Sequence, residues 1–512
     1  MKKINILILL FVFSLSMIHT SCDDGFEELN TSDIAINELD PVPILNYAIW
    51  RSSPHFFRHT MIYEMAIVQH MITPFGTSLA GGNYNQENFG VAQNTWENNY
   101  ANVIRNTVDI ISKYSDNPDR ANIYNMARII RAYAGMVLTD TYGDIPYSNA
   151  GLGFIERNGT PVYDTQESIY TSVLSDLEEA TAALSADSRI EGGDVLYAGD
   201  ITQWKRFGYS LMLRAAMRLT KVNPSLAQEY VTKAVAGGVM ESNDDNAMIR
   251  HSANYPNDVG GQLNGSEAAN FYMTKPLVDY FQANDDPRLE VMAVRYVGAT
   301  SGSTQTEAVA TRDPADQIGH PIGYDNNSIG ARAEADGVGS FYGYTQFDRR
   351  TIGKQDAPFF MLTYAQTQFL LAEAVVREWI DGDAATYFAN GIRGHMEQLA
   401  IHDANLVIEE SAIAAYIQAH PLETGTALEQ INTQYWVACL FNGEEAFANF
   451  RRSGYPALEP NPYPQSAIAG DFIRRLTYHT SEYTNNLENI NTAISRQGPD
   501  KLDTRVWWDV QQ

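Results

Sequence analysis

Residues 126–137 read Met-Ala-Arg-Ile-Ile-Arg-Ala-Tyr-Ala-Gly-Met-Val and decide the fold class. The large apolar residues of this stretch recur every three or four positions, at Met126, Ile129, Ile130, Tyr133 and Val137. This spacing places them on one stripe of an α-helix. Small residues lie between them, at Ala127, Ala132 and Ala134. A second helix can therefore pack closely against this one.

The same spacing recurs further along the chain. Apolar stripes run through residues 169–184 and 204–219. Asn223-Pro224 and Gly237-Gly238 mark the two ends of another helix, because Asn caps a first turn, Pro fits that turn and Gly ends a helix. Further helices are predicted at about residues 360–379, 383–399 and 427–449, with Asp383 as the cap of the second.

Helix pairs repeat roughly every 30–45 residues between positions 93 and 240, which is typical of a tetratricopeptide-like solenoid. We therefore predict a mainly α-helical protein whose scaffold covers residues 93–240 and 360–455. Residues 241–358 differ, because Gly, Asn, Asp and Ser are frequent and long apolar stripes are missing. Long loops inside a compact domain are uncommon and often functional, so this region is predicted to meet a ligand or a partner.

A secretory signal is predicted at the start of the chain. Two lysines precede the apolar residues 4–18, a run too short for a permanent membrane helix. Cys22 follows at the expected cleavage point, so we predict that residues 1–21 are removed and that Cys22 is acylated. Three positions before the cysteine, such signals usually carry an apolar residue, whereas this chain has His19. An ordinary cleaved signal with an incidental cysteine is the alternative.

The composition limits the partners of the mature chain. Beyond Cys22 no apolar run approaches the roughly 20 residues that cross a bilayer, so residues 22–512 are predicted to form one lipid-tethered domain. The formal net charge is −27, which disfavours binding to nucleic acid or anionic lipid. Cys439 is the one other cysteine, so no internal disulfide is expected, and its apolar neighbours favour a buried packing role.

Several stretches occur in one order along the chain, and together they resemble the SusD/RagB-type outer-membrane lipoproteins, in particular the second SusD-like family. They are residues 127–133 leading into 138–147, 361–366 leading into 369–374, 442–447, 451–456, 474–478 and 504–509. Each motif is short, but the set spans nearly the whole mature chain.

The resemblance implies four tetratricopeptide-like helix pairs in a right-handed superhelical scaffold, with a loop-rich remainder. It implies a lipid-anchored protein on the outer face of the outer membrane. Such a protein binds a nutrient, often a glycan, and delivers it to a TonB-dependent SusC-like transporter without breaking a bond. The acidic residues after Cys22 suit the surface-export signal of these lipoproteins. No binding residue carries over, because the ligand loops vary across the family.

Sugar recognition favours aromatic rings, which stack on the C–H face of a pyranose, beside amide and carboxylate groups, which bind its hydroxyls. The Gly-rich loops at residues 73–96 and 319–350 supply both. The predicted ligand platform is a subset of Phe75, Tyr84, Trp96, Tyr324, Tyr342 and Tyr344. Packing of each ring against the body is the alternative, above all for Trp96, which begins a helical stretch.

Other chemistry is less well supported by the sequence. Asp140 and Asp144 are predicted to hydrogen-bond the turn at a helix end, with a catalytic pair as the alternative. His55 and His59 can share a helix face, but no third zinc ligand is evident. No cofactor is predicted, although loop carboxylates can hold a structural calcium ion at a place that the sequence does not reveal.

Two further functions remain open at this stage. The same scaffold can bind a peptide or another non-glycan nutrient, since a fold does not fix its ligand. A surface glycoside hydrolase with two carboxylates is the other alternative, and no acidic pair is singled out for it.

Overall fold

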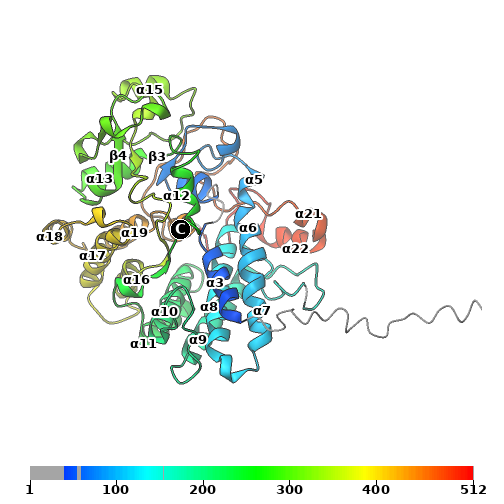
Figure 1. Cartoon of the computed structure of the whole chain (residues 1–512). Coiled ribbons are helices and arrows are strands. Elements are labelled where there is room, and N and C mark those ends of the chain that lie inside the picture. Colours follow the sequence, from blue (N-terminus) through cyan, green and yellow to red (C-terminus); the bar gives the residue numbers. More distant parts are fainter. Residues whose placement is uncertain (1–39, 55–58, 154, 511–512) are drawn as a thin grey trace, which may run out of the picture. The chain divides into compact units, whose positions relative to one another are not determined.

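Helices are the main secondary structure of the described residues and the strands are few and short, so the mainly helical prediction is confirmed (Figure 1). The computed structural model describes residues 40–54, 59–153 and 155–510. The longer helices are α3 (Pro41–Arg51), α7 (Arg105–Tyr114), α8 (Ala121–Tyr142), α9 (Gln166–Ala183), α10 (Ile201–Arg218), α11 (Pro224–Gly237), α13 (Lys275–Ala283), α16 (Tyr364–Val376), α17 (Ala384–His402), α18 (Glu410–Ala419), α19 (Ala427–Ala438), α20 (Gly443–Ser453) and α22 (Leu487–Gln497). The shorter ones are α4 (Met65–Ile67), α5 (Phe89–Ala92), α6 (Asn94–Asn98), α12 (Asp258–Leu263), α14 (Arg288–Met292), α15 (Gly330–Ala335) and α21 (Glu482–Asn485), with π-helical turns η1 (His59–Glu64) and η3 (Asn99–Ile104).

Short antiparallel strands link the loops to this helical body. Their bounds are β1 (Met71–Ile72), β2 (Ala247–Ile249), β3 (Tyr272–Met273), β4 (Ala293–Tyr296), β5 (Ala310–Thr311), β6 (Gln346–Phe347) and β7 (Phe359–Leu362). β1 pairs with β3, β2 with β7, and β4 with both β5 and β6. Because β1 and β3 are about 200 residues apart in the sequence, this pairing fixes the N-terminal loops against the loop-rich region.

Consecutive helices pack side by side, with α8 on α9, α9 on α10, α10 on α11, and α16 on α17. The caps follow the sequence prediction. The Asn223 side chain accepts a hydrogen bond from the Leu226 amide at the start of α11, and Asp383 accepts from Ala385 and Thr386 at the start of α17. Gly143, with φ +85°, ends α8 where a β-carbon would be strained.

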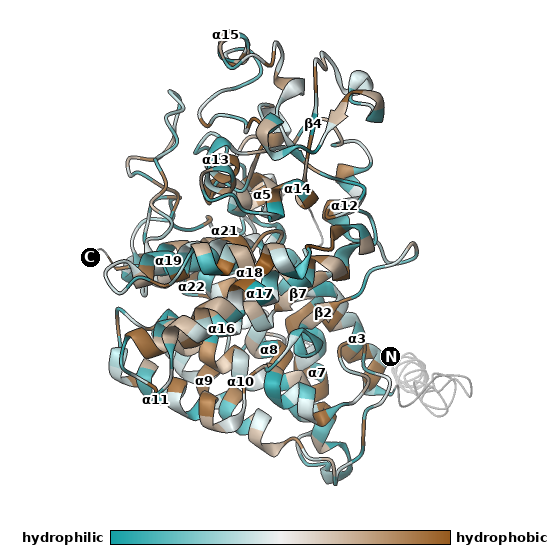
Figure 2. Cartoon of the chain, turned by 90° about the vertical axis from the view of Figure 1, so that its left-hand side faces the viewer, coloured by the Kyte–Doolittle hydropathy of each residue, from teal (hydrophilic) through white to brown (hydrophobic). Residues whose placement is uncertain are grey.

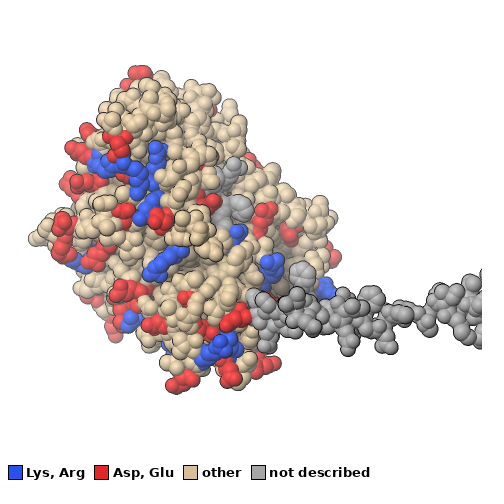
Figure 3. Space-filling model, viewed as in Figure 1, with Lys and Arg blue, Asp and Glu red and all other residues tan. Residues whose placement is uncertain are grey.

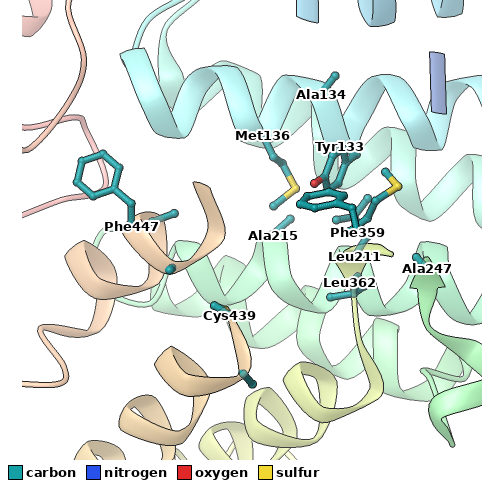
Figure 4. Close-up of a cluster of buried hydrophobic side chains, with 14 of the residues drawn as sticks. Tyr133, Ala134, Met136, Leu211, Ala215, Ala247, Phe359, Leu362, Cys439 and Phe447 are labelled. Carbon is teal, nitrogen blue, oxygen red and sulfur yellow. The ribbon is translucent and has the colours of Figure 1, made fainter. Parts of the chain in front are cut away.

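The main core lies where α8, α10 and the C-terminal helices cross. Figure 4 shows Tyr133 and Met136 of α8 facing Leu211 and Ala215 of α10, with Cys439 on the neighbouring helical segment. All five are buried, and burial raises the pKa of the Cys439 thiol well above its usual range. Cys439 therefore acts as a small packing residue, as its apolar surroundings predicted.

One predicted helix is wrong. Residues 427–449 form two helices, α19 and α20, rather than one. Phe441 takes a positive φ of 66° between them, and the Asn442 side chain then caps α20 by accepting a hydrogen bond from the Glu445 amide. α19 packs on α16, and α20 packs on α8 and η1. The break between the two helices is short, so the apolar pattern looked continuous in the sequence.

The loop-rich region and the helical pairs occupy different parts of the unit that starts at Val42. α13, α15 and β4 lie at one end, and α9, α10 and α11 lie at the other (Figures 1 and 2). On the face drawn in Figure 3, acidic side chains are spread along the left-hand and lower margins, with smaller groups of Lys and Arg between them. Within the described ranges, no helix is both long enough and apolar enough to span a bilayer.

Candidate functional site

Half-buried aromatic rings from three separate loops gather near α15. They are Phe75, Tyr324, Phe341, Tyr342 and Tyr463, here called the aromatic cluster. The Phe341 ring lies edge-on to Phe75 at a centroid distance of 5.5 Å and lies 4.1 Å from Tyr342. Tyr324 and Phe341 pack on one small core that includes Tyr344. These contacts hold the rings in place while part of each stays open to solvent.

Hydrogen bonds between the loops set this arrangement. The Asn326 amide donates to the Pro74 carbonyl at 2.7 Å, which ties the loop before α15 to the loop of Phe75. Asn461 Nδ2 donates to the Asn83 carbonyl at 2.7 Å, and the Tyr463 hydroxyl donates to Asp325 Oδ2 at 3.1 Å. Segments more than 300 residues apart therefore form one surface.

Polar groups lie beside the rings. Although burial opposes it, hydrogen bonds from Ser328 and Asn327 and from the Tyr463 hydroxyl lower the pKa of Asp325. The Asp325 carboxylate is therefore charged at neutral pH. Asn326 and Asn327 follow it and are exposed. A sugar lying on the rings would meet both hydrogen-bond acceptors and donors here.

Three of the six residues predicted from the sequence belong to the aromatic cluster. Phe75, Tyr324 and Tyr342 are each half-buried, so part of each ring is accessible. Their role in ligand binding stays a prediction. Phe341 and Tyr463 complete the cluster and were not predicted. Phe341 lies in the loop 319–350, which was predicted to bind a ligand. The Pro-rich segment around Tyr463 has no sequence feature that indicates a binding loop, apart from the tyrosine itself.

The other three predicted residues are buried. The Tyr84 hydroxyl donates to the Pro74 carbonyl, and its ring lies 4.3 Å from that of Tyr463. The Tyr344 hydroxyl donates to Asp336 at 2.8 Å. Trp96 lies in α6 against Tyr100, Tyr142, Tyr163 and Tyr478. In the structure these rings pack against the body, which is the alternative that the sequence left open for each.

The two aspartates at the end of α8 bind protein groups. Asp140 is buried and accepts hydrogen bonds from Tyr170, Arg218 and the Trp508 indole. Asp144 accepts from the Gln166 amide and from Arg496. Asp140 therefore joins α8 to α9, α10 and the C-terminal segment, rather than capping its own turn as predicted.

The acidic and basic residues of α20 also reach across to other helices. Glu445 pairs with Arg218, Arg452 pairs with Glu373, and His59 contacts Glu444 at 2.9 Å. In the described part of the chain, no group of three His, Cys, Asp or Glu side chains is placed to hold a metal ion. Cys22 and His55 lie outside the described residues.

Comparisons with known proteins agree with this architecture. A model of the second SusD-like family, described as starch-binding and associating with the outer membrane, matches residues 34–479. A solved structure named as a chitin-binding protein is 32% identical, with a TM-score of 0.82 over 92% of this chain and 100% of its own.

Two further solved structures are similar. A SusD-like protein described as Bacteroidetes AC2a SusD-like is 28% identical, with a TM-score of 0.80 over 92% of this chain and 100% of its own. A chitin-binding SusD homologue from Flavobacterium johnsoniae is 26% identical, with a TM-score of 0.76 over 92% of this chain and 98% of its own. No curated protein matches the sequence significantly. The family model covers most of the chain, and the protein therefore belongs to the second SusD-like family.

Proposed function

We propose that this protein is a cell-surface lipoprotein that binds a glycan chain on its aromatic cluster and delivers it to a TonB-dependent transporter. The glycan lies across the half-buried rings of Phe75, Tyr324 and Tyr342. Asp325, Asn326 and Asn327 bind its hydroxyl groups. No bond of the ligand is broken.

The observation that carries this proposal is the aromatic cluster itself. Loops from distant parts of the sequence are joined by hydrogen bonds so that several rings stay partly open beside an ionised carboxylate. Single exposed apolar residues are ordinary, but apolar rings that gather in one partly exposed patch are a common sign of a binding surface. Binding residues are also concentrated on loops that a rigid scaffold positions, which is the relation of this cluster to the helical body.

The related structures support a glycan as the ligand. Two of the similar proteins are named as chitin-binding, at 32% and 26% identity. Oligomers of N-acetylglucosamine are therefore the first probes to use. The family description, association with the outer membrane, supports the surface location. Acylation at Cys22 supplies the attachment, and a SusC-like barrel receives the glycan.

A binding screen tests the proposal. Purified protein without its signal is applied to a glycan panel that includes chitin, starch and xylan oligosaccharides, and each ligand is recovered and analysed for cleavage. Retention of an intact glycan is the expected result. Cleavage that is lost on changing one Asp or Glu would instead identify a hydrolase. Retention of peptides with no glycan bound would favour a peptide-binding protein.

A further inference from the structure

A cavity of about 260 Å³ lies between α22, the start of α9 and the C-terminal segment. The residues that line it include Trp507, Arg496, Arg505 and Glu167. None of these residues belongs to the aromatic cluster. In Figure 2, α22 lies well below α15.

The C-terminal segment holds Trp507 at this cavity. Val506 and Trp508, on either side of it, are buried, and the Trp508 indole donates to Asp140 at 2.9 Å. The Trp508 amide also donates to the Gln166 side chain. With both neighbours fixed in the core, Trp507 stays half-buried at the cavity wall. Part of a large apolar ring is therefore kept in contact with solvent.

The charged groups of the wall are also held in place. Arg496 Nε and Nη2 donate to Asp144 Oδ2 at 3.0 and 2.9 Å, and Arg505 Nη1 donates to Asp509 at 2.7 Å. The two arginine side chains remain 37% and 34% exposed. Each guanidinium has five N–H donors, so both retain donors beyond these bonds. Glu167 is exposed in the first turn of α9 and supplies acceptor oxygens.

We propose that this cavity is a second carbohydrate site, which takes one pyranose residue of a glycan. The C–H face of the sugar lies on Trp507, and its hydroxyl groups bind Arg496, Arg505 and Glu167. The cavity is slightly below the usual range of ligand pockets, roughly 300–1,000 Å³, which fits one sugar ring rather than a longer segment.

The second site adds to the proposed function without depending on it. Two separate sites on one protein raise the effective affinity for a polymer that reaches both, since the second contact becomes intramolecular. A polysaccharide strand would then stay on the surface protein longer than a short oligosaccharide.

Fluorine NMR of protein labelled with 5-fluorotryptophan tests this site directly. The Trp507 resonance is assigned from its loss in Trp507→Phe. It is then followed during titration with cellotriose, xylotriose and the N-acetylglucosamine trimer to millimolar concentration. A saturable shift of this resonance with at least one trimer is expected. The resonance of Trp379, a half-buried tryptophan outside the cavity, serves as the internal control and stays in place.

Two sets of variants make the result decisive. Glu167→Gln combined with Arg505→Gln should weaken the titration at least about five-fold, whereas Arg105→Gln, at an exposed arginine elsewhere, should leave it unchanged. The triple variant Phe75→Ala, Tyr324→Ala, Tyr342→Ala should keep the Trp507 shift, since it alters only the aromatic cluster. The proposal is overturned if no trimer moves the Trp507 resonance, if the double variant titrates like the unchanged protein, or if the triple variant abolishes the shift.

Discussion

Arg218 lies between two carboxylates inside the helical body. Its Nε donates to Asp140 at 3.2 Å and its Nη2 donates to Glu445 at 2.7 Å, and the side chain is 1% exposed. Removing Arg218 takes the arginine partner from Asp140 and leaves Glu445 with Arg214 alone, at 3.6 Å, so buried negative charge is compensated less well. Arg218→Met is therefore expected to lower the free energy of unfolding by about 3–5 kcal/mol.

Urea denaturation measures this loss, and a surface pair provides the control. Lys113 and Asp109 are four residues apart on α7 with 61% and 35% of their side chains exposed. Lys113→Met should cost less than about 0.5 kcal/mol. Equal losses in the two variants would contradict a special role for the buried arginine.

The buried carboxyl group of Glu64 is expected to make the stability of the folded protein depend on pH. It is fully buried, and neither carboxylate oxygen has a hydrogen-bond partner among the described residues. Burial raises its pKa to about 8 in the folded protein, against the opposing effect of His59. In the unfolded chain the group titrates near its ordinary value, roughly 4.3. The contribution of the neutral Glu64 carboxyl to the stability of the protein is therefore fully present below that pH. It is lost as the pH rises towards 8.

Glu64→Gln removes this loss, because the amide does not ionise. The thermal midpoint of the variant should exceed that of the unchanged protein by a few degrees above pH ~8, with the difference shrinking towards pH ~4.5. Thermal melts across this range measure the difference, and Glu429→Gln, at an exposed glutamate, should follow the unchanged protein. A difference that does not vary with pH would show that Glu64 does not titrate in this window.

Single residues also show how far the sequence could predict the site. Phe75, Tyr324 and Tyr342 were chosen for their loop setting, and the structure leaves their rings partly open. Tyr84 and Tyr344 have the same setting, yet they are buried because other loops fold over them. Composition near a ring does not reveal which distant segment will cover it.

At the level of helices, the start of α20 depends on a close approach to η1. A β-carbon on Gly443 would lie 2.5 Å from Thr60 Oγ1 and 2.9 Å from Glu64 Cβ. Gly443→Ala is therefore expected to cost about 1–3 kcal/mol through overpacking, although alanine favours a helix. Gly261 lies in α12 with open space around it, so Gly261→Ala should be neutral or slightly stabilising. Unfolding curves that rank the two the other way would contradict this packing.

The helices were the most predictable part of the fold. α8, α9, α10 and α11 follow from apolar spacing and from local caps, which are properties of neighbouring residues. The break between α19 and α20 was missed, because it depends on a positive φ at Phe441 and on the contact of Gly443 with a segment almost 400 residues away. The spacing of neighbouring residues contains no information about contacts between segments that are far apart in the sequence.

For the molecule as a whole, the lipid anchor proposed at Cys22 is expected to decide where the protein works. Cys22→Ala should release the protein from the membrane fraction, because the substitution removes the thiol that is proposed to be acylated, and stable anchoring by lipid requires more than one acyl chain. Cell fractionation followed by immunoblotting measures the distribution. A variant that stays with the outer membrane would show that protein contacts, rather than the lipid, hold it there.

The aromatic cluster is a property of the whole molecule as well. Its loops are joined by hydrogen bonds such as the one from Asn461 to the Asn83 carbonyl, two residues that are 378 positions apart in the sequence. The resemblance of the motifs to the SusD/RagB family predicted the fold and the class of function, but only the folded chain brings Phe341 and Tyr463 to the same surface as Phe75.

Isothermal titration calorimetry with a chitin hexamer tests the central claim most directly. The unchanged protein is compared with the triple variant Phe75→Ala, Tyr324→Ala, Tyr342→Ala, and with Tyr255→Ala, which removes a 58% exposed ring outside the cluster. The account predicts that the triple variant stays folded and binds at least about ten-fold more weakly, while Tyr255→Ala binds as the unchanged protein does. Equal affinity of the folded triple variant and the unchanged protein would contradict it.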